Sequence, residues 1–197
     1  PEAVLDGAVA IGSAFTKRPI EQFFSRKETG FKTPKGVSVL GYAGCPHWSL
    51  SRSLVGLPRT GPYDVDLNAL PFQLATDGEP PRSGRWIVEV HPALALWLWL
   101  RDVVTKSQDW KYKQSEILQM QFWNLLLEEV FSSISDFQGL APPRDDDEFD
   151  ARISFALGTL WIRHKSECPK LLGDLSNGTF LIPVTDKLEQ GFSEFTN

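Results

Sequence analysis

The pattern of apolar and polar residues along the chain predicts short buried strands that alternate with helices. Residues 8–11 form an apolar run closed by a Gly-Ser pair, which is typical of a buried strand before a tight turn. Residues 85–91 and residues 179–184 form two further apolar runs of strand length. Strands separated by helices indicate a largely parallel or mixed sheet covered on both faces. The predicted fold class is therefore α/β, a mixed sheet flanked by helices.

Four helices are expected from apolar residues that recur every three or four positions. Thr16 caps a first helix that carries apolar residues on one face. The second helix covers residues 93–104 behind a proline, and it is apolar on nearly all sides, so we expect it to be buried. The longest pattern covers residues 114–134. An acidic run opens the last helix, which continues over residues 145–164.

Residues 29–84 interrupt this pattern with closely spaced glycines and prolines. We interpret them as a long loop-rich excursion that contains one short helix at about residues 48–55. A chain of 197 residues fits one domain. Residues 1–197 are therefore expected to form a single domain.

Composition adds one feature to this picture and limits the partners. Seven Trp and thirteen Phe predict a core rich in aromatic side chains. The net charge of −5 provides no general attraction to nucleic acid, so any such contact has to be local. The patterns do not define an oligomeric state.

The cysteines and the longest apolar segment indicate the compartment. Cys45 and Cys168 lie far apart, and no signal peptide is present, which favours free thiols in the cytoplasm. Cys45 and His47 form a Cys-x-His pair, but zinc needs three or four ligands, so an ordinary loop is favoured. The apolar residues 93–100 reach only about a third of a membrane span, which argues against a membrane protein.

Glu89 is the first candidate for chemistry. It lies within an apolar strand, near its C-terminal end and just before a buried helix. A lone carboxylate in such a place costs several kcal/mol unless it is paired or binds a cation, and α/β sheets bind ligands at the C-terminal ends of strands. The alternatives are a structural salt bridge, for example to Arg85, or exposure at a sheet edge.

Asp147 and Asp150 are the second candidate. Acidic residues in a first helical turn are explained by capping and by the helix dipole. Helical spacing, however, places Asp150 on the same face as Ile153, Leu157 and Trp161, with Asp147 at the margin of that face. Two carboxylates three residues apart are able to share a divalent cation with a strand carboxylate.

Three further residues are candidates for substrate contacts. Lys113 suits contact with a phosphate, or it is a solvated lysine at the start of a helix. Strand alternation puts His91 on the same face as Glu89, where it is a ligand, a proton shuttle or a histidine that starts the next helix. His47 lies in the glycine-rich excursion, where loop residues often serve function. Serine-hydrolase and nucleotide-binding motifs do not occur.

These residues follow one another in an order that resembles a known family. The positions are Val9 to Gly12, Arg18 and Glu21, Glu89 to Pro92, Lys111 to Lys113, Asp146-Asp147-x-x-Asp150-Ala151, and Phe180 to Pro183. The chain resembles, over nearly its whole length, the ribonuclease H-like "domain of unknown function 429" family of predicted nucleases. The resemblance implies a ribonuclease H-like fold and a site for magnesium or manganese held by Glu89, Asp147 and Asp150.

The chain departs from that family at its first strand. The superfamily carries a central Asp on this strand, whereas Asp6 precedes the strand and Gly12 stands where the family tends to have an acid. We expect one or more strands to precede Pro1. Two hypotheses follow: a metal-dependent nuclease acting on nucleic acid with Glu89, Asp147 and Asp150 as ligands, and a non-catalytic relative used for binding or assembly.

Overall fold

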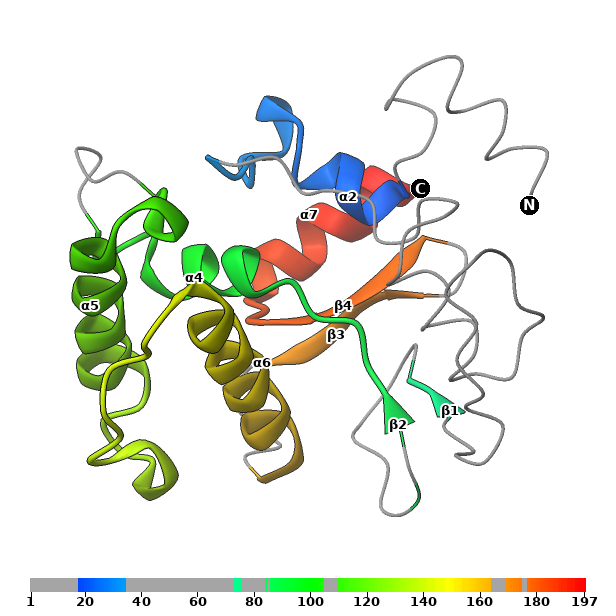
Figure 1. Cartoon of the computed structure of the whole chain (residues 1–197). Helices are drawn as coiled ribbons and strands as arrows, with labels where there is room; N and C mark the ends of the chain where they lie inside the picture. Colours follow the sequence, from blue (N-terminus) through cyan, green and yellow to red (C-terminus); the bar gives the residue numbers. More distant parts are fainter. Residues whose placement is uncertain are drawn as a thin grey trace, which may run out of the picture.

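A computed structural model of the chain describes residues 18–34, 73–75, 84, 86–104, 110–163, 169–174 and 177–197 (Figure 1). The strand expected at residues 8–11, the short helix at 48–55, His47 and both cysteines lie outside these ranges. The same holds for most of the excursion at 29–84 and for Arg85.

Helices and short strands follow one another along the described part of the chain. In order they are α2 (Pro19–Phe23), η2 (Lys27–Thr29), β1 (Gln73–Leu74), β2 (Trp86–Ile87), α4 (Pro92–Leu100), η3 (Tyr112–Gln114), α5 (Glu116–Leu125), the π-helical η4 (Leu126–Val130), η5 (Ser135–Phe137), α6 (Asp146–Arg163), β3 (Lys170–Asp174), β4 (Gly178–Ile182) and α7 (Asp186–Thr196). The general α/β expectation is confirmed.

The strands form two small sheets that are joined by a single bridge. β1 and β2 are parallel, with Leu74 opposite Ile87. β3 and β4 are antiparallel, with Leu172 opposite Phe180. The chain after β2 then runs parallel to β4 through a bridge between Val90 and Leu181. Parallel and antiparallel pairs therefore both occur.

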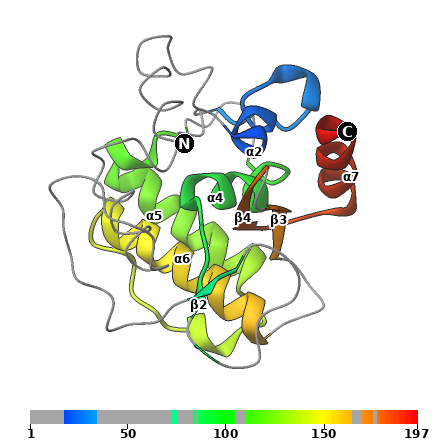
Figure 2. The ribbon, with the colours of Figure 1, turned by 90° about the vertical axis from the view of Figure 1, so that its right-hand side faces the viewer.

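Two hydrophobic clusters lie on opposite faces of β4, because successive side chains of a strand point to opposite sides. Phe180 and Ile182 belong to a cluster with residues of α2 and α7. Leu181 belongs to the other cluster, which contains residues of α4, α5 and α6. Figures 1 and 2 show the same division, with α2 and α7 on one side of the hairpin and α4, α5 and α6 on the other.

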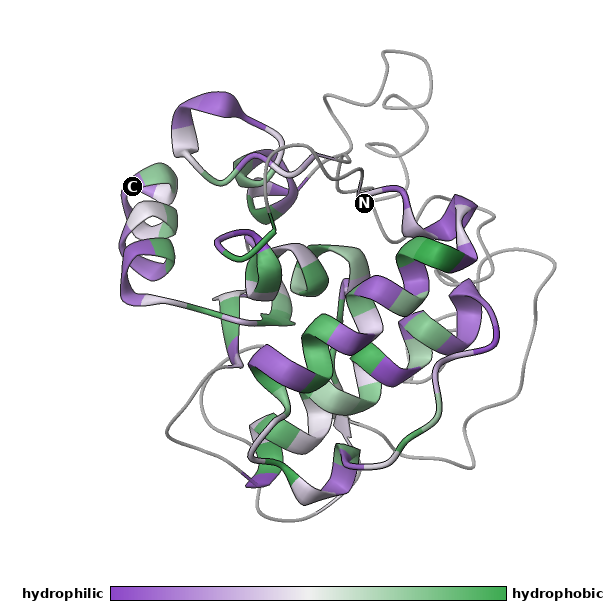
Figure 3. Cartoon of the chain, turned by 90° about the vertical axis from the view of Figure 1, so that its left-hand side faces the viewer, coloured by the Kyte–Doolittle hydropathy of each residue, from purple (hydrophilic) through white to green (hydrophobic). Residues whose placement is uncertain are grey.

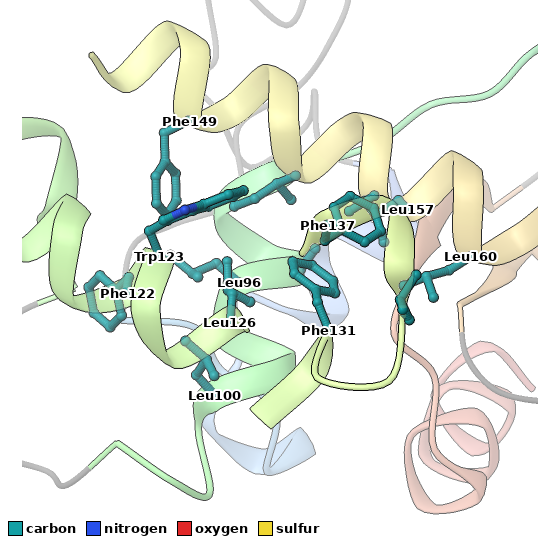
Figure 4. Packing of buried hydrophobic residues seen from close by; sticks show 14 of the residues in the cluster. Leu96, Leu100, Phe122, Trp123, Leu126, Phe131, Phe137, Phe149, Leu157 and Leu160 are labelled. Carbon is teal, nitrogen blue, oxygen red and sulfur yellow. The ribbon is translucent and has the colours of Figure 1, made fainter. Parts of the chain in front are cut away.

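Aromatic side chains fill much of the larger cluster, as the composition predicts. Trp123 and Phe149 pack edge to face in it, and Phe131 stacks on Phe137 at 4.5 Å between ring centroids (Figure 4). In Figure 3 hydrophilic and hydrophobic residues alternate along the helices, as expected for elements with one buried side. Within the described ranges, no helix has both the length and the apolar character needed to cross a membrane.

Two predicted helices differ in how closely they match the structure. α4 starts at Pro92 and contributes Leu94 to one cluster and Leu96 to the other, which confirms a helix buried on several sides. The single helix predicted over 114–134 corresponds to α5 and η4, which together reach Val130, and it is wrong from Phe131 onward. There the backbone N–H of Phe131 donates to the carbonyl of Leu126 at 2.8 Å, five residues back, so the chain widens into a π-helical turn and leaves the helix.

Candidate functional site

Glu89 forms a two-pronged ion pair with Arg18. The Nη1 of Arg18 donates to Oε2 of Glu89 at 2.7 Å, and its Nη2 donates to Oε1 at 2.6 Å. The backbone carbonyl of Glu89 accepts from the N–H of Leu181 at 2.8 Å, which fixes this residue beside β4. The side chain of Glu89 is 17% exposed. Such paired bonds between guanidinium and carboxylate are among the strongest hydrogen bonds in proteins.

Arg18 also binds a second carboxylate, Glu21, which is fully buried. Oε1 of Glu21 accepts from Nη2 and Nε of Arg18 at 2.8 and 3.2 Å, and its Oε2 accepts from the backbone N–H of Arg18 at 2.9 Å. Burial raises the pKa of Glu21 above its ordinary value, although Arg18 opposes this effect. Burial lowers the pKa of Arg18, but the bonds and charges of Glu89 and Glu21 raise it overall. One cation thus serves two carboxylates.

A close approach between α2 and β4 positions Arg18. Gly178 begins β4 with a φ of 80°, and a Cβ on it would lie 2.8 Å from Cδ of Arg18 and 3.0 Å from Cγ2 of Ile20. The guanidinium lies over the ring of Phe180 at 5.3 Å, and the N–H of Ile20 donates to the carbonyl of Asn177 at 3.1 Å. A side chain at position 178 would occupy the space that Arg18 uses.

Asp150 forms a second cluster with two residues that precede α5. The hydroxyl of Tyr112 donates to Oδ1 of Asp150 at 2.6 Å, and the ammonium of Lys113 donates to Oδ2. Tyr112 is buried, and burial together with the bond to Asp150 raises its pKa above the ordinary value. The side chain of Asp150 is 23% exposed. Asp150 therefore lies at the margin of the core, and Lys113 forms an ion pair with it.

The other acidic residues at the start of α6 act as helix caps and ion-pair partners. Asp147 is exposed in the first turn. The Oδ1 of Asp145 accepts from the backbone N–H of Glu148 at 2.7 Å. Glu148 itself pairs with Arg144 at 2.8 Å and with Arg152 at 2.5 Å. These contacts agree with the capping alternative for this acidic run.

His91 caps the start of α4. Its Nδ1 accepts from the backbone N–H of Leu94 at 3.2 Å, and its ring lies edge-on to Phe180 with 6.0 Å between centroids. This is the arrangement of a histidine that starts a helix. His47 lies outside the described residues.

The three predicted ligands do not come together in the described part of the chain. No group of three or more His, Cys, Asp or Glu side chains able to hold a metal ion occurs among the described residues. Both oxygens of Glu89 accept from Arg18, both oxygens of Asp150 accept from Tyr112 and Lys113, and Asp147 is exposed. Magnesium requires several free oxygen ligands around one point. The arrangement of these side chains does not fit a shared metal ion.

Arg18 and Glu21 form the ion-pair network around Glu89, and the search for chemistry in the sequence did not single them out. Their spacing contains a usable signal, because a proline at the first helical position and an acid at the third are typical of a helix start. Pro19 and Glu21 fill these two positions in α2. The signal identifies the cap but not its long-range partner Glu89.

Comparison of the chain with protein families, with curated proteins and with solved structures finds no match.

Proposed function

We propose that this chain is a non-catalytic, cytoplasmic ribonuclease H-like protein used for binding or assembly. The ion pair between Arg18 and Glu89 is the observation that carries the proposal. It gives the carboxylate of Glu89 a role in holding α2 against the segment between β2 and α4, which lies beside β4. The acids of α6 have comparable roles, as caps of the helix and as partners of Lys113, Arg144 and Arg152.

The arrangement of the strands supports a ribonuclease H-like fold for this proposal. A parallel pair leads into a segment that runs parallel to β4 and bears Glu89, and α4 follows directly. β3 pairs antiparallel with the other edge of β4, and helices cover both faces. Mixed sheets covered in this way are typical of α/β domains.

The energetics of the Arg18 cluster also favour a structural role. Freeing Glu89 to bind a metal ion would leave Arg18 with Glu21 alone and would break two charge-assisted bonds. Breaking a buried ion pair costs about 3–5 kcal/mol. A metal ion would have to recover this free energy in addition to its own dehydration.

A nuclease that uses magnesium or manganese is the second candidate function. Two observations favour it: the carboxylates of Glu89 and Asp150 are both partly exposed, and the cationic Lys113 lies directly beside Asp150. A cation next to these acids is suited to contact a phosphate of nucleic acid.

Calorimetric titration with magnesium and manganese distinguishes the two candidates. We expect the wild type, Glu89→Gln and Asp150→Asn to show the same weak or undetectable heats at millimolar metal. Glu116→Gln is the matched control, because Glu116 is an exposed acid in the first turn of α5 and is not one of the three predicted ligands. Saturable binding that is lost in both Glu89→Gln and Asp150→Asn, together with metal-dependent cleavage of labelled DNA or RNA by the wild type, would refute the non-catalytic proposal.

A further inference from the structure

An apolar stripe runs along the exposed side of α6. Phe155 is 62% exposed and Ile162 is 60% exposed, and these two side chains lie two helical turns apart. Gly158 lies between them, and Ala151 lies one turn before Phe155. All four residues share one face, since spacings of three and four residues keep side chains aligned. We call Ala151, Phe155, Gly158 and Ile162 the α6 stripe.

The α6 stripe lies opposite the core face of the helix. Phe149, Leu157 and Leu160 point from α6 into the larger cluster (Figure 4). One edge of the Phe155 ring reaches Phe137, with 6.1 Å between ring centroids, yet most of the side chain stays exposed. Exposed apolar side chains that share one helix face are a starting point for an interaction surface when they form a continuous patch.

Among the described residues, none occupies the position that a side chain on Gly158 would take. A Cβ built on this residue would meet nothing within 4 Å. Glycine in a helix interior costs about 0.5–1 kcal/mol relative to alanine. The fold of one copy does not explain this cost, whereas a notch that receives a side chain from another molecule does explain it.

The order of residues in the α6 stripe is self-complementary. Its members alternate small, large, small, large along the helix. Under a two-fold axis that makes two helices antiparallel, Phe155 faces Gly158 of the second copy, and Ala151 faces Ile162 of the second copy. Every large side chain then meets a small one, as interdigitating helices require. A parallel pairing would instead place Phe155 against Phe155.

We propose that the α6 stripe docks onto the α6 stripe of a second copy of this chain in an antiparallel, two-fold symmetric dimer. Charge supports this choice of partner. α6 has Asp146 and Asp147 in its first turn, beside Glu148, which pairs with Arg144 and Arg152. Its last turn has Arg163, which is 60% exposed and also pairs with Asp136. Antiparallel pairing places the acidic start of each helix beside the basic end of the other, and it also opposes the two helix dipoles.

The dimer gives the assembly role proposed above a specific partner, and in this sense it rests on that proposal. The two proposals fail separately, however. A monomeric chain that binds no metal ion would overturn the dimer alone, and a dimer that cleaves nucleic acid would overturn the non-catalytic role alone.

Sedimentation of the full chain over about 1 µM to 1 mM tests the dimer. We expect a species of twice the 22.1 kDa chain mass at the upper end of this range. Phe155→Asp weakens self-association about tenfold or more, because it places a charge in the centre of the interface. Ile117→Asp is the matched control, since Ile117 is 70% exposed on α5 and lies outside the α6 stripe.

Two further variants test the antiparallel register. Gly158→Phe alone should weaken the dimer, because it places a ring against Phe155 of the second copy. The double variant Phe155→Gly with Gly158→Phe keeps a large residue facing a small one, so we expect it to restore association to within about threefold of the wild type. In a monomer, neither change would affect association.

Several results would overturn the proposal. The first is a monomer at every concentration, which is also the result expected if a segment of this chain outside the described residues covers the α6 stripe. The second is a dimer that Ile117→Asp weakens as much as Phe155→Asp does. The third is a dimer in which the double variant associates no better than Gly158→Phe, because that result excludes the antiparallel register.

Discussion

Replacing Arg18 by methionine removes the cation that Glu21 and Glu89 share and leaves these two carboxylates close together. Glu21 is fully buried, and it loses both side-chain bonds that it accepts from Arg18. Loss of one partner of a buried ion pair costs about 3–5 kcal/mol. Glu89 keeps some contact with solvent, which reduces its share. We therefore expect Arg18→Met to lower the free energy of unfolding by about 3 kcal/mol, a large fraction of the total for a typical domain.

Urea unfolding followed by tryptophan fluorescence measures this loss. A change of about 3 kcal/mol moves the midpoint by about 1.5 M if the slope is about 2 kcal/mol per molar urea. Arg26→Met is the matched control, because Arg26 is exposed, donates one hydrogen bond to Gln22 at 3.2 Å and lies over the ring of Phe195. Arg26→Met should cost less than about 1 kcal/mol.

A second substitution separates lost packing from lost charge. Glu21→Gln in the Arg18→Met background removes the uncompensated buried charge, so it should recover part of the stability. The reasoning would be refuted if Arg18→Met unfolded within about 0.5 kcal/mol of Arg26→Met, the error of such measurements. In that case the ion pairs would not hold α2 against the segment between β2 and α4, and Glu89 would be free to serve another role.

Three further outcomes are expected. Gly173→Ala should lower the free energy of unfolding by more than about 2 kcal/mol, roughly the strain of a left-handed residue, because Gly173 has a φ of 103° and its Cβ would collide with the carbonyl of Gly178. Gly30→Ala is the control: Gly30 has a φ of 73° and open space around it, so the loss should be only about 1 kcal/mol. Urea unfolding measures both losses. Phe149→Ala should lower the free energy of unfolding by about 3–5 kcal/mol in the same assay, because the ring is fully buried and its centroid lies 4.9 Å from that of Tyr112. A loss below about 1 kcal/mol would contradict the described packing. The bonds from Arg144 lower the pKa of Glu148 to about 2, with a further contribution from Arg152. Its stabilising effect is therefore complete above its unfolded pKa and is lost as pH falls toward 2. Thermal melts between pH 2 and 6 should show a smaller pH dependence for Glu148→Gln than for wild type, and equal slopes would argue against these ion pairs.

The elements that the sequence predicts well are those with local start signals and strong periodicity. α4 begins at Pro92 as expected, and α6 covers the acidic run and the apolar repeat that follows it. The end of α5 is harder to predict, because residues 126–130 continue the helical pattern. The departure comes from Phe131, which is buried against Phe137 in the folded core. Tertiary packing of this kind overrides a local periodic signal.

The candidate site shows the same limit on a longer scale. The sequence identifies Glu89 as a buried carboxylate that needs a partner, and this requirement is met. Its partner Arg18 lies 71 residues away, and no local pattern connects the two positions. Asp150 was expected on the core face, and it lies at the margin of that face beside Tyr112 and Lys113, a second long-range pairing. Which cation or metal ion satisfies a carboxylate depends on the folded topology.

The smaller hydrophobic cluster has a consequence for how the chain folds during synthesis. It joins Phe23 and Phe24 of the first described segment to Leu188 and Phe192 of the last one. A ribosome releases the α2 segment well before α7, so Phe23 and Phe24 lack these partners until α7 emerges. During that interval α2 exposes apolar surface. Folding of the α2 segment therefore depends on α7, and we expect premature termination before α7 to produce an aggregation-prone product rather than a shorter folded protein.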